Sequence, residues 1–181
     1  MTIYTKKGDK GETGLPGGRR LPKVDQVFET LGNLDQANAF LGLAISFMVK
    51  DEDKNLINQL QEVQVSLLGV GACLASTEPN NHPLIKKLPA LTKALEYQID
   101  QWNELLPELN NFILPGGTNS GASLHITRTA LRQAERSFHR LDDSQKIEEV
   151  SIYLNRLSDY FFQAARFYNF IHHQEEDIWA L

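Results

Sequence analysis

A line of charged side chains recurs at helical spacing between residues 128 and 139. It consists of Arg128, Arg132, Glu135 and His139, which follow one another at four, three and four residues. At about 100° per residue, these positions share one stripe of a helix. Two arginines one turn apart repel each other unless an anion lies between them, and their planar guanidinium groups suit carboxylates and phosphates. The stripe therefore indicates either a site for an anionic ligand or a salt-bridged bundle surface.

A second candidate for anion binding lies near the N-terminus. Residues 8–18 contain five of the 12 glycines, and residues 5–23 contain six of the 18 Lys and Arg residues. Because glycine has no side chain, successive backbone N–H groups can converge on phosphate oxygens, with nearby Lys and Arg supplying positive charge. The pattern is not the G-x-x-x-x-G-K-[ST] phosphate loop. The segment is thus either a phosphate-binding nest or a flexible N-terminal arm.

Further polar groups border the apolar stripes of the predicted helices. Asn155, Asp159, Phe162 and Arg166 follow one face of the helix predicted near the C-terminus, and Asp35 and Asn38 lie on or beside a core face. Buried polar groups need partners, so these positions form either a structural hydrogen-bond network or part of a site.

The elements that must position these groups are amphipathic helices. Apolar residues alternate at spacings of three and four over residues 27–48, 56–74 and 150–171, and less regularly over 89–106 and 120–141. Short connections between such helices predict an antiparallel bundle with shallow crossing angles. We therefore expect an all-α fold. A five-helix antiparallel bundle would span residues 25–172, after an extended Gly-rich loop in residues 1–24, within a single domain of residues 1–181.

Composition narrows the possible partners. The chain has 181 residues, 41% of them hydrophobic and 23% charged, as in globular domains. Its net charge is −5 although residues 5–23 alone carry +4, so we expect a local anionic ligand and no nucleic acid. The apolar stretches are too short to span a bilayer, so we expect a cytoplasmic protein with no membrane partner. Cys73 is the only cysteine, and no motif predicts a metal site built by the protein.

The ordered motifs resemble those of the PduO-type ATP:cob(I)alamin adenosyltransferases over nearly the whole chain. Residues 5–11, TKKGDKG, are similar to the T-x-x-G-D-x-G signature of that family. Residues 112–117 match its F-x-L-P-G-G loop, and residues 154–160 match its L-N-R-L-S-D-Y motif. The run from Pro22 to Asn38 continues the opening signature in register, and residues 128–136 match the fourth-helix motif. Any one motif alone is a weak signal, whereas four in order are specific.

The resemblance implies an enzyme that transfers the 5′-deoxyadenosyl group of ATP to the cobalt of cob(I)alamin, its second substrate, with Mg²⁺ as cofactor. The products would be adenosylcobalamin and triphosphate. It implies a homotrimer in which ATP lies between the N-terminal loop of one chain and the fourth helix of its neighbour. Asp35 would pair with Arg128 across that interface, and Phe112 would lie by the corrin ring.

The same resemblance assigns the site residues. Those it implies for catalysis are Arg128, Arg132, Glu135 and Phe112. Those it implies for binding are Thr5, Lys6, Lys7, Gly8, Asp9, Lys23, Asp35, Arg132, Glu135, Arg136, Asn155, Asp159 and Phe162.

Three positions depart from the family pattern. Gln36 stands where Glu is usual, Asn33 where Thr is frequent, and Gln133 replaces a second adjacent arginine. Because these changes remove charge near the subunit seam, we expect weaker trimer contacts or weaker substrate binding.

A non-catalytic cobalamin carrier and a purely structural helical trimer are the alternative functions, and a cobalamin-dependent recipient enzyme is a candidate partner.

Overall fold

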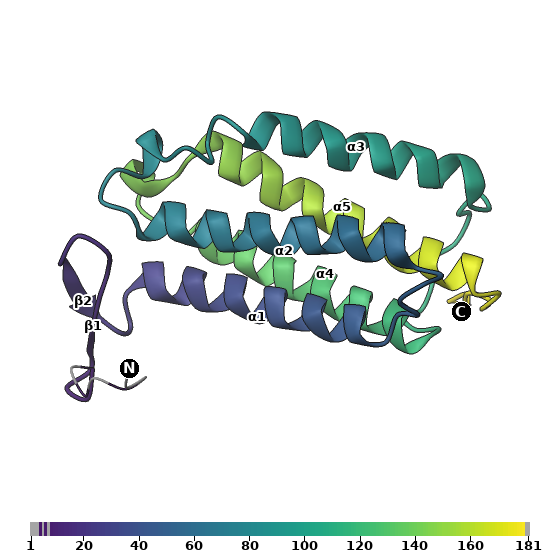
Figure 1. Ribbon diagram of the computed structural model, residues 1–181, viewed down its shortest axis with the longest axis horizontal. Helices are drawn as coiled ribbons and strands as arrows, with labels where there is room; N and C mark the ends of the chain where they lie inside the picture. Colours follow the sequence, from purple (N-terminus) through teal and green to yellow (C-terminus); the bar gives the residue numbers. More distant parts are fainter. Residues whose placement is uncertain (1–3, 5, 7, 180–181) are drawn as a thin grey trace.

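The three-and-four spacing of apolar residues forms five long helices in the computed structural model, which describes residues 4, 6 and 8–179 (Figure 1). The helices are α1 (Gln26–Ser46), α2 (Lys54–Ala75), α3 (Leu88–Leu105), α4 (Asn119–Phe138) and α5 (Glu148–Ile171). Two short 3₁₀ helices, η1 (Pro79–Asn81) and η2 (Asp143–Gln145), precede α3 and α5. Successive long helices alternate in direction, which confirms the predicted five-helix antiparallel bundle.

The closest backbone approaches link the helices in the order α2, α1, α4, α5 and α3. Side-chain hydrogen bonds from Gln59 to Gln98 and between Ser66 and Tyr153 also join α2 to α3 and α5, which closes the bundle. α3 and α5 are neighbours that run in the same direction, because α4 returns between them in sequence (Figure 1). Trp102 of α3 joins this pair, since its ring lies 5.0 Å from that of Tyr160 and 5.3 Å from that of Phe167. Within the described ranges, no helix is both long enough and apolar enough to cross a membrane.

Local sequence signals explain where three of the long helices begin. Asp25 caps α1 by accepting a hydrogen bond from the Val27 N–H, and Thr118 caps α4 by accepting one from the Gly121 N–H. Pro89 lies in the first turn of α3, where its missing N–H costs little. α4 ends at Phe138 rather than at the predicted Leu141, although Leu141 remains buried in the core.

The Gly-rich N-terminal segment is more ordered than an extended loop. Strands β1 (Glu12–Gly14) and β2 (Arg20–Pro22) pair antiparallel, with Thr13 opposite Leu21. Gly17 and Gly18 lie between the strands with positive φ angles of 85° and 88°, which glycine adopts without steric cost. Figure 1 shows this hairpin beyond the N-terminal end of α1. Apolar spacing could not predict it, because three-residue strands are too short to show alternation.

Candidate active site

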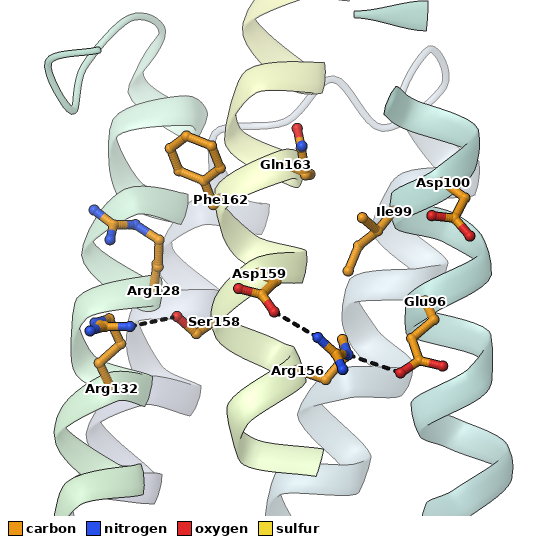
Figure 2. Close-up of a pocket in the computed structure, with 10 residues that line it drawn as sticks. All are labelled: Glu96, Ile99, Asp100, Arg128, Arg132, Arg156, Ser158, Asp159, Phe162 and Gln163. Carbon is orange, nitrogen blue, oxygen red and sulfur yellow. Dashed lines mark hydrogen bonds and ion pairs between the residues drawn. The ribbon is translucent and has the colours of Figure 1, made fainter. Parts of the chain in front are cut away.

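A cleft with a volume of about 690 Å³ lies on the outer face of α3, α4 and α5 (Figure 2). α4 supplies Arg128 and Arg132, and the side chain of Arg132 reaches Ser158 of α5. The remaining lining residues come from α3 and α5: Glu96, Ile99, Asp100, Arg156, Ser158, Asp159, Phe162 and Gln163. The structure therefore brings together four predicted site residues of α4 and α5, namely Arg128, Arg132, Asp159 and Phe162.

Arg128 has a guanidinium group that forms no ion pair with any described residue. Its Nε atom is buried and has no hydrogen-bond partner among the described residues. Its Cζ atom lies 5.9 Å from the centre of the Phe162 ring, within reach of a cation–π contact. Burial lowers the pKa of Arg128, and the positive charge of Arg132 lowers it further. A bound anion would favour the charged form of Arg128 and so would oppose both effects on its pKa.

Arg132 lies one turn further along α4 and is more exposed. Its Nη1 atom donates a hydrogen bond of 3.3 Å to the Ser158 Oγ atom of α5 (Figure 2). A neutral hydroxyl leaves the charge of the arginine uncompensated. Arg128 and Arg132 thus form a positively charged wall of the cleft, here called the arginine wall, whose guanidinium geometry suits an anion.

The opposite wall of the cleft is charged but internally paired. The Arg156 Nε atom lies 3.0 Å from Glu96 Oε1, and its Nη1 atom lies 2.8 Å from Asp159 Oδ2. Asp159, expected to bind ligand, is therefore engaged with Arg156 in this structure. The sequence reasoning missed Glu96 and Asp100, although their spacing of four residues on a predicted helix signals a shared face.

Glu135 and Asn155 form a second group, one turn from Arg132 towards the end of the bundle that carries the hairpin. The Asn155 Nδ2 atom donates a hydrogen bond of 2.9 Å to Glu135 Oε1, so α4 and α5 present the two side chains together. Arg136 is exposed in the last turn of α4. These three predicted ATP-binding residues are contiguous with the arginine wall.

Phe112 lies at the other end of the bundle, in the connection between α3 and α4. Its side chain is 78% exposed, and its ring meets that of Trp179 edge-on at 6.2 Å. The backbone beside it pairs with the C-terminal segment, because Leu114 N–H donates to the Asp177 carbonyl and Trp179 N–H donates to the Phe112 carbonyl. The sequence patterns did not predict this pairing.

That C-terminal segment is itself anchored to α5. Arg166, for which the sequence left open a structural network or a site, is buried and forms an ion pair of 2.9 Å with Glu176. Its Nη2 atom also donates to the Pro107 carbonyl at 3.0 Å. A buried charge needs such partners, so Arg166 is a structural residue. It joins the C-terminal segment at Glu176 to the connection after α3 at Pro107.

Asp35 and Asn38 lie elsewhere, on the side of α1 that faces α2. Asn38 and Gln64 exchange two hydrogen bonds of 3.3 Å between side chain and backbone, so Asn38 belongs to a structural network. Asp35 is exposed, and within the described part of the chain no ion pair joins it to Arg128. Asp35 lies beside α2, whereas Arg128 lines the cleft of α3, α4 and α5.

The N-terminal residues contribute a separate basic surface. Lys6 and Asp9 are exposed, and a β-carbon added at Gly8 would come within 3.3 Å of the Lys23 Nζ atom. Thr5 and Lys7, both expected to bind ATP, lie outside the described residues. The Lys23 N–H donates to the Gly11 carbonyl at 2.8 Å, which fixes Lys23 against the start of the hairpin.

Comparison with known proteins identifies the family. A family model described as cobalamin adenosyltransferase matches residues 3–168. The chain belongs to this family. The corrinoid adenosyltransferase of Bacillus subtilis (strain 168) is 42% identical over 172 residues, covering 93% of this chain and 87% of the relative. The human corrinoid adenosyltransferase MMAB is 37% identical over 172 residues, covering 91% and 68% of the two chains.

Solved structures of the family agree with the bundle. A variant of the PduO-type ATP:corrinoid adenosyltransferase from Lactobacillus reuteri, complexed with cobalamin and ATP, superposes with a TM-score of 0.90 at 37% identity. The match covers 98% of this chain and 96% of that one. Another variant of that enzyme, complexed with ATP, gives a TM-score of 0.89 at 36% identity. The family membership and fold implied by the motifs are thereby confirmed.

Proposed function

We propose that this chain transfers the 5′-deoxyadenosyl group of ATP to the cobalt of cob(I)alamin, and that the cleft between α3, α4 and α5 is part of its active site. Corrinoid adenosyltransferases are 35–42% identical to this chain over most of its length, which supports this activity. The observation that carries the proposal is the arginine wall, in which Arg128 has a buried nitrogen without a partner among the described residues.

The reaction forms one bond and breaks another at the same carbon. The cobalt of cob(I)alamin donates its electron pair to the 5′ carbon of ATP. The bond between that carbon and the triphosphate oxygen breaks, and the triphosphate leaves with the bonding electron pair. Because cob(I)alamin is already a strong nucleophile, the protein needs no general base and mainly has to stabilise the leaving group.

The residues present suit that task. Arg128 and Arg132 would stabilise the charge that accumulates on the departing triphosphate, as preorganised donors do in other group transfers. Glu135, Arg136 and Asn155 would orient the nucleotide beside them. Phe112, exposed at the end of the bundle, would lie against the lower face of the corrin ring and keep an axial ligand from the cobalt.

We further propose that the site is completed by a second chain in a homotrimer. The basic N-terminal segment, with Gly8, Asp9 and Lys23, would reach the arginine wall of a neighbour, and Asp35 would pair with the neighbour's Arg128. The exposure of Asp35 and the uncompensated charge of Arg128 both support this arrangement. A cytoplasmic location and a cobalamin-dependent recipient enzyme remain predictions of the sequence.

Mg²⁺ fits this site as an ion bound chiefly to the triphosphate. The described residues contain no group of three His, Cys, Asp or Glu side chains that could hold a metal ion by themselves. Mg²⁺ commonly binds through one or two carboxylates and substrate phosphates, and Glu135 is the carboxylate next to the arginine wall. When bound, the ion would offset part of the negative charge of the leaving group.

The test is a direct assay under anaerobic conditions. Purified protein is mixed with ATP, Mg²⁺ and chemically reduced cobalamin, and the absorption spectrum of adenosylcobalamin is followed. Formation of that spectrum supports the proposal. Corrin binding without turnover would instead show a cobalamin carrier, and binding of neither ligand would show a structural bundle.

A further inference from the structure

Asn169, a buried residue near the end of α5, makes three hydrogen bonds to the segment that joins Phe112 to α4. Its Oδ1 atom accepts bonds from the Thr118 N–H at 3.0 Å and from the Thr118 hydroxyl at 2.9 Å. Its Nδ2 atom donates to the Gly116 carbonyl at 3.1 Å. The side chain is only 3% exposed, so this amide is committed to one segment of backbone.

The two glycines nearest to Asn169 show how closely that segment is held. A β-carbon at Gly117 would lie 2.3 Å from Asn169 Nδ2, and one at Gly121 would lie 2.2 Å from Asn169 Oδ1. Gly117 also has a positive φ of 95°, which L-residues with side chains rarely adopt. The Pro-Gly-Gly run and Gly121 therefore leave space that the Asn169 amide fills.

The segment held by Asn169 connects two parts of the proposed active site. Phe112 lies four residues before Gly116 in the chain, and Thr118 is the N-cap of α4, the helix that carries both arginines. On α5 itself, Phe162 precedes Asn169 by seven residues, which is two helical turns on the same stripe. Asn169 is thus the point at which the Phe112 segment, the start of α4 and α5 are joined.

We infer that Asn169 is a positioning residue that fixes Phe112 relative to the arginine wall for the corrin substrate. The inference rests on the proposed function, because it takes Phe112 to act at the corrin ring. Capping alone does not require Asn169, since the Thr118 hydroxyl already accepts the Gly121 N–H at 2.9 Å. The additional bond to Gly116 instead fixes the backbone on the Phe112 side of the cap.

The test compares Asn169→Ala and Asn169→Asp with the wild-type protein. Asn169→Ala removes all three bonds, whereas Asn169→Asp keeps the two that Oδ1 accepts and loses the donor to Gly116. We expect Asn169→Ala to lower kcat/KM for reduced cobalamin by about 10- to 100-fold, the size of effect that a misplacement near 1 Å produces. The KM for ATP should change by less than about twofold, and Asn169→Asp should fall between Asn169→Ala and wild type.

A matched control separates positioning from general loss of stability. Ser66→Ala removes another buried hydrogen bond to α5, the one between Ser66 and Tyr153, away from the Phe112 segment. Ser66→Ala should not lower kcat/KM for reduced cobalamin selectively relative to its effect on the KM for ATP. Equal loss for ATP and cobalamin in Asn169→Ala, or the same selective loss in Ser66→Ala, would overturn the inference.

Two readouts without turnover distinguish this inference from the proposed function. Hydrogen exchange of the peptide spanning residues 112–118 should accelerate in Asn169→Ala. In a parallel experiment, each protein is mixed with ATP and cob(II)alamin. The absorption spectrum should show that a smaller fraction of the cob(II)alamin loses its lower axial ligand on Asn169→Ala than on the wild-type protein. If wild-type protein makes no adenosylcobalamin, the proposed function fails, and an unchanged ligand-loss spectrum in Asn169→Ala then overturns the positioning role separately.

Discussion

Gln133 on α4 donates a hydrogen bond of 3.1 Å to the side-chain oxygen of Asn33 on α1. Both residues depart from the family pattern, and the structure shows that they are partners within one chain. Asn33 is buried and also donates to Glu29 at 3.4 Å, so a neutral polar pair links α1 to α4 here. The two changes, which the sequence linked to weaker trimer contacts, therefore also form a hydrogen bond within one protomer.

This pair should show measurable coupling in a double-mutant cycle. Asn33→Ala and Gln133→Ala should each destabilise the fold, and the coupling energy should be about 0.5–1.5 kcal/mol, as for a partly buried hydrogen bond. Urea unfolding of the four proteins measures it. Strict additivity would mean that the contact contributes nothing to stability.

Arg132→Ala should reduce turnover by at least about 100-fold, because it removes a preorganised charge beside the leaving triphosphate. The helix content and the melting temperature should stay close to wild type, since Arg132 is exposed and, among the described residues, donates one side-chain hydrogen bond, to Ser158. Lys93→Ala, which removes an exposed positive charge from α3 outside the cleft, is the matched control and should remain active. Near wild-type turnover in Arg132→Ala would refute the assignment of the arginine wall to ATP.

Phe112→Ala should impair the cobalamin half of the reaction selectively. Its side chain is exposed, so truncation should cost little stability, whereas loss of the ring would let an axial ligand return to the cobalt. Reduction of bound cob(II)alamin should slow markedly while the KM for ATP changes by less than about twofold. Stopped-flow spectroscopy and steady-state kinetics measure the two effects, and equal damage to both would contradict the division of roles.

Gly121→Ala should destabilise the protein even though alanine normally favours a helix by about 1 kcal/mol over glycine. The new methyl group would collide with Asn169 Oδ1. In an Asn169→Ala background the collision is absent, so Gly121→Ala should then be neutral or stabilising.

The matched control for that substitution is Gly32→Ala. Gly32 is also helical, and nothing lies within 4 Å of its added β-carbon, so this change should be neutral or stabilising in both backgrounds. Thermal unfolding of the set measures the effects. If Gly121→Ala behaves like Gly32→Ala in the wild-type background, the close packing of Asn169 is wrong.

Acid should destabilise the fold through His125, which is 3% exposed on α4. Burial first, and then the charge of Arg128, lower the pKa of His125 from 6.5 to about 4, against a smaller opposing effect of Glu176. Between about pH 6.5 and 4, His125 is therefore protonated in the unfolded chain but remains neutral in the folded protein. Stability should be fully present above that window and should fall towards acid by up to about 1.4 kcal/mol per pH unit.

His125→Gln should flatten this part of the stability profile, because glutamine does not titrate. Urea unfolding at pH 7, 6, 5 and 4 gives the comparison. The difference between the two slopes assigns the effect to His125, because all other titrating groups are common to both proteins. An identical slope in both would show that His125 does not cause the acid sensitivity.

Local patterns in the sequence were sufficient for most of the bundle. The spacing of apolar residues predicted all five long helices to within a few residues, and the charged stripe of α4 predicted that Arg128 and Arg132 share a face. These features depend on helical geometry, which repeats every 3.6 residues and is visible in any short window. The ordered motifs also established the family, because several short matches in register are specific.

The tertiary structure alone determined the contacts between segments that lie far apart in the chain. The sequence alone did not pair the backbone of Phe112 with Trp179, did not bury Arg166 against Glu176, and did not place the Asn169 amide against Gly121. Nor did it join Asn33 to Gln133. Such contacts depend on how helices cross and where connections end, and no periodicity within one segment encodes that geometry. The residue types were readable from the sequence, but only packing determined which of them meet.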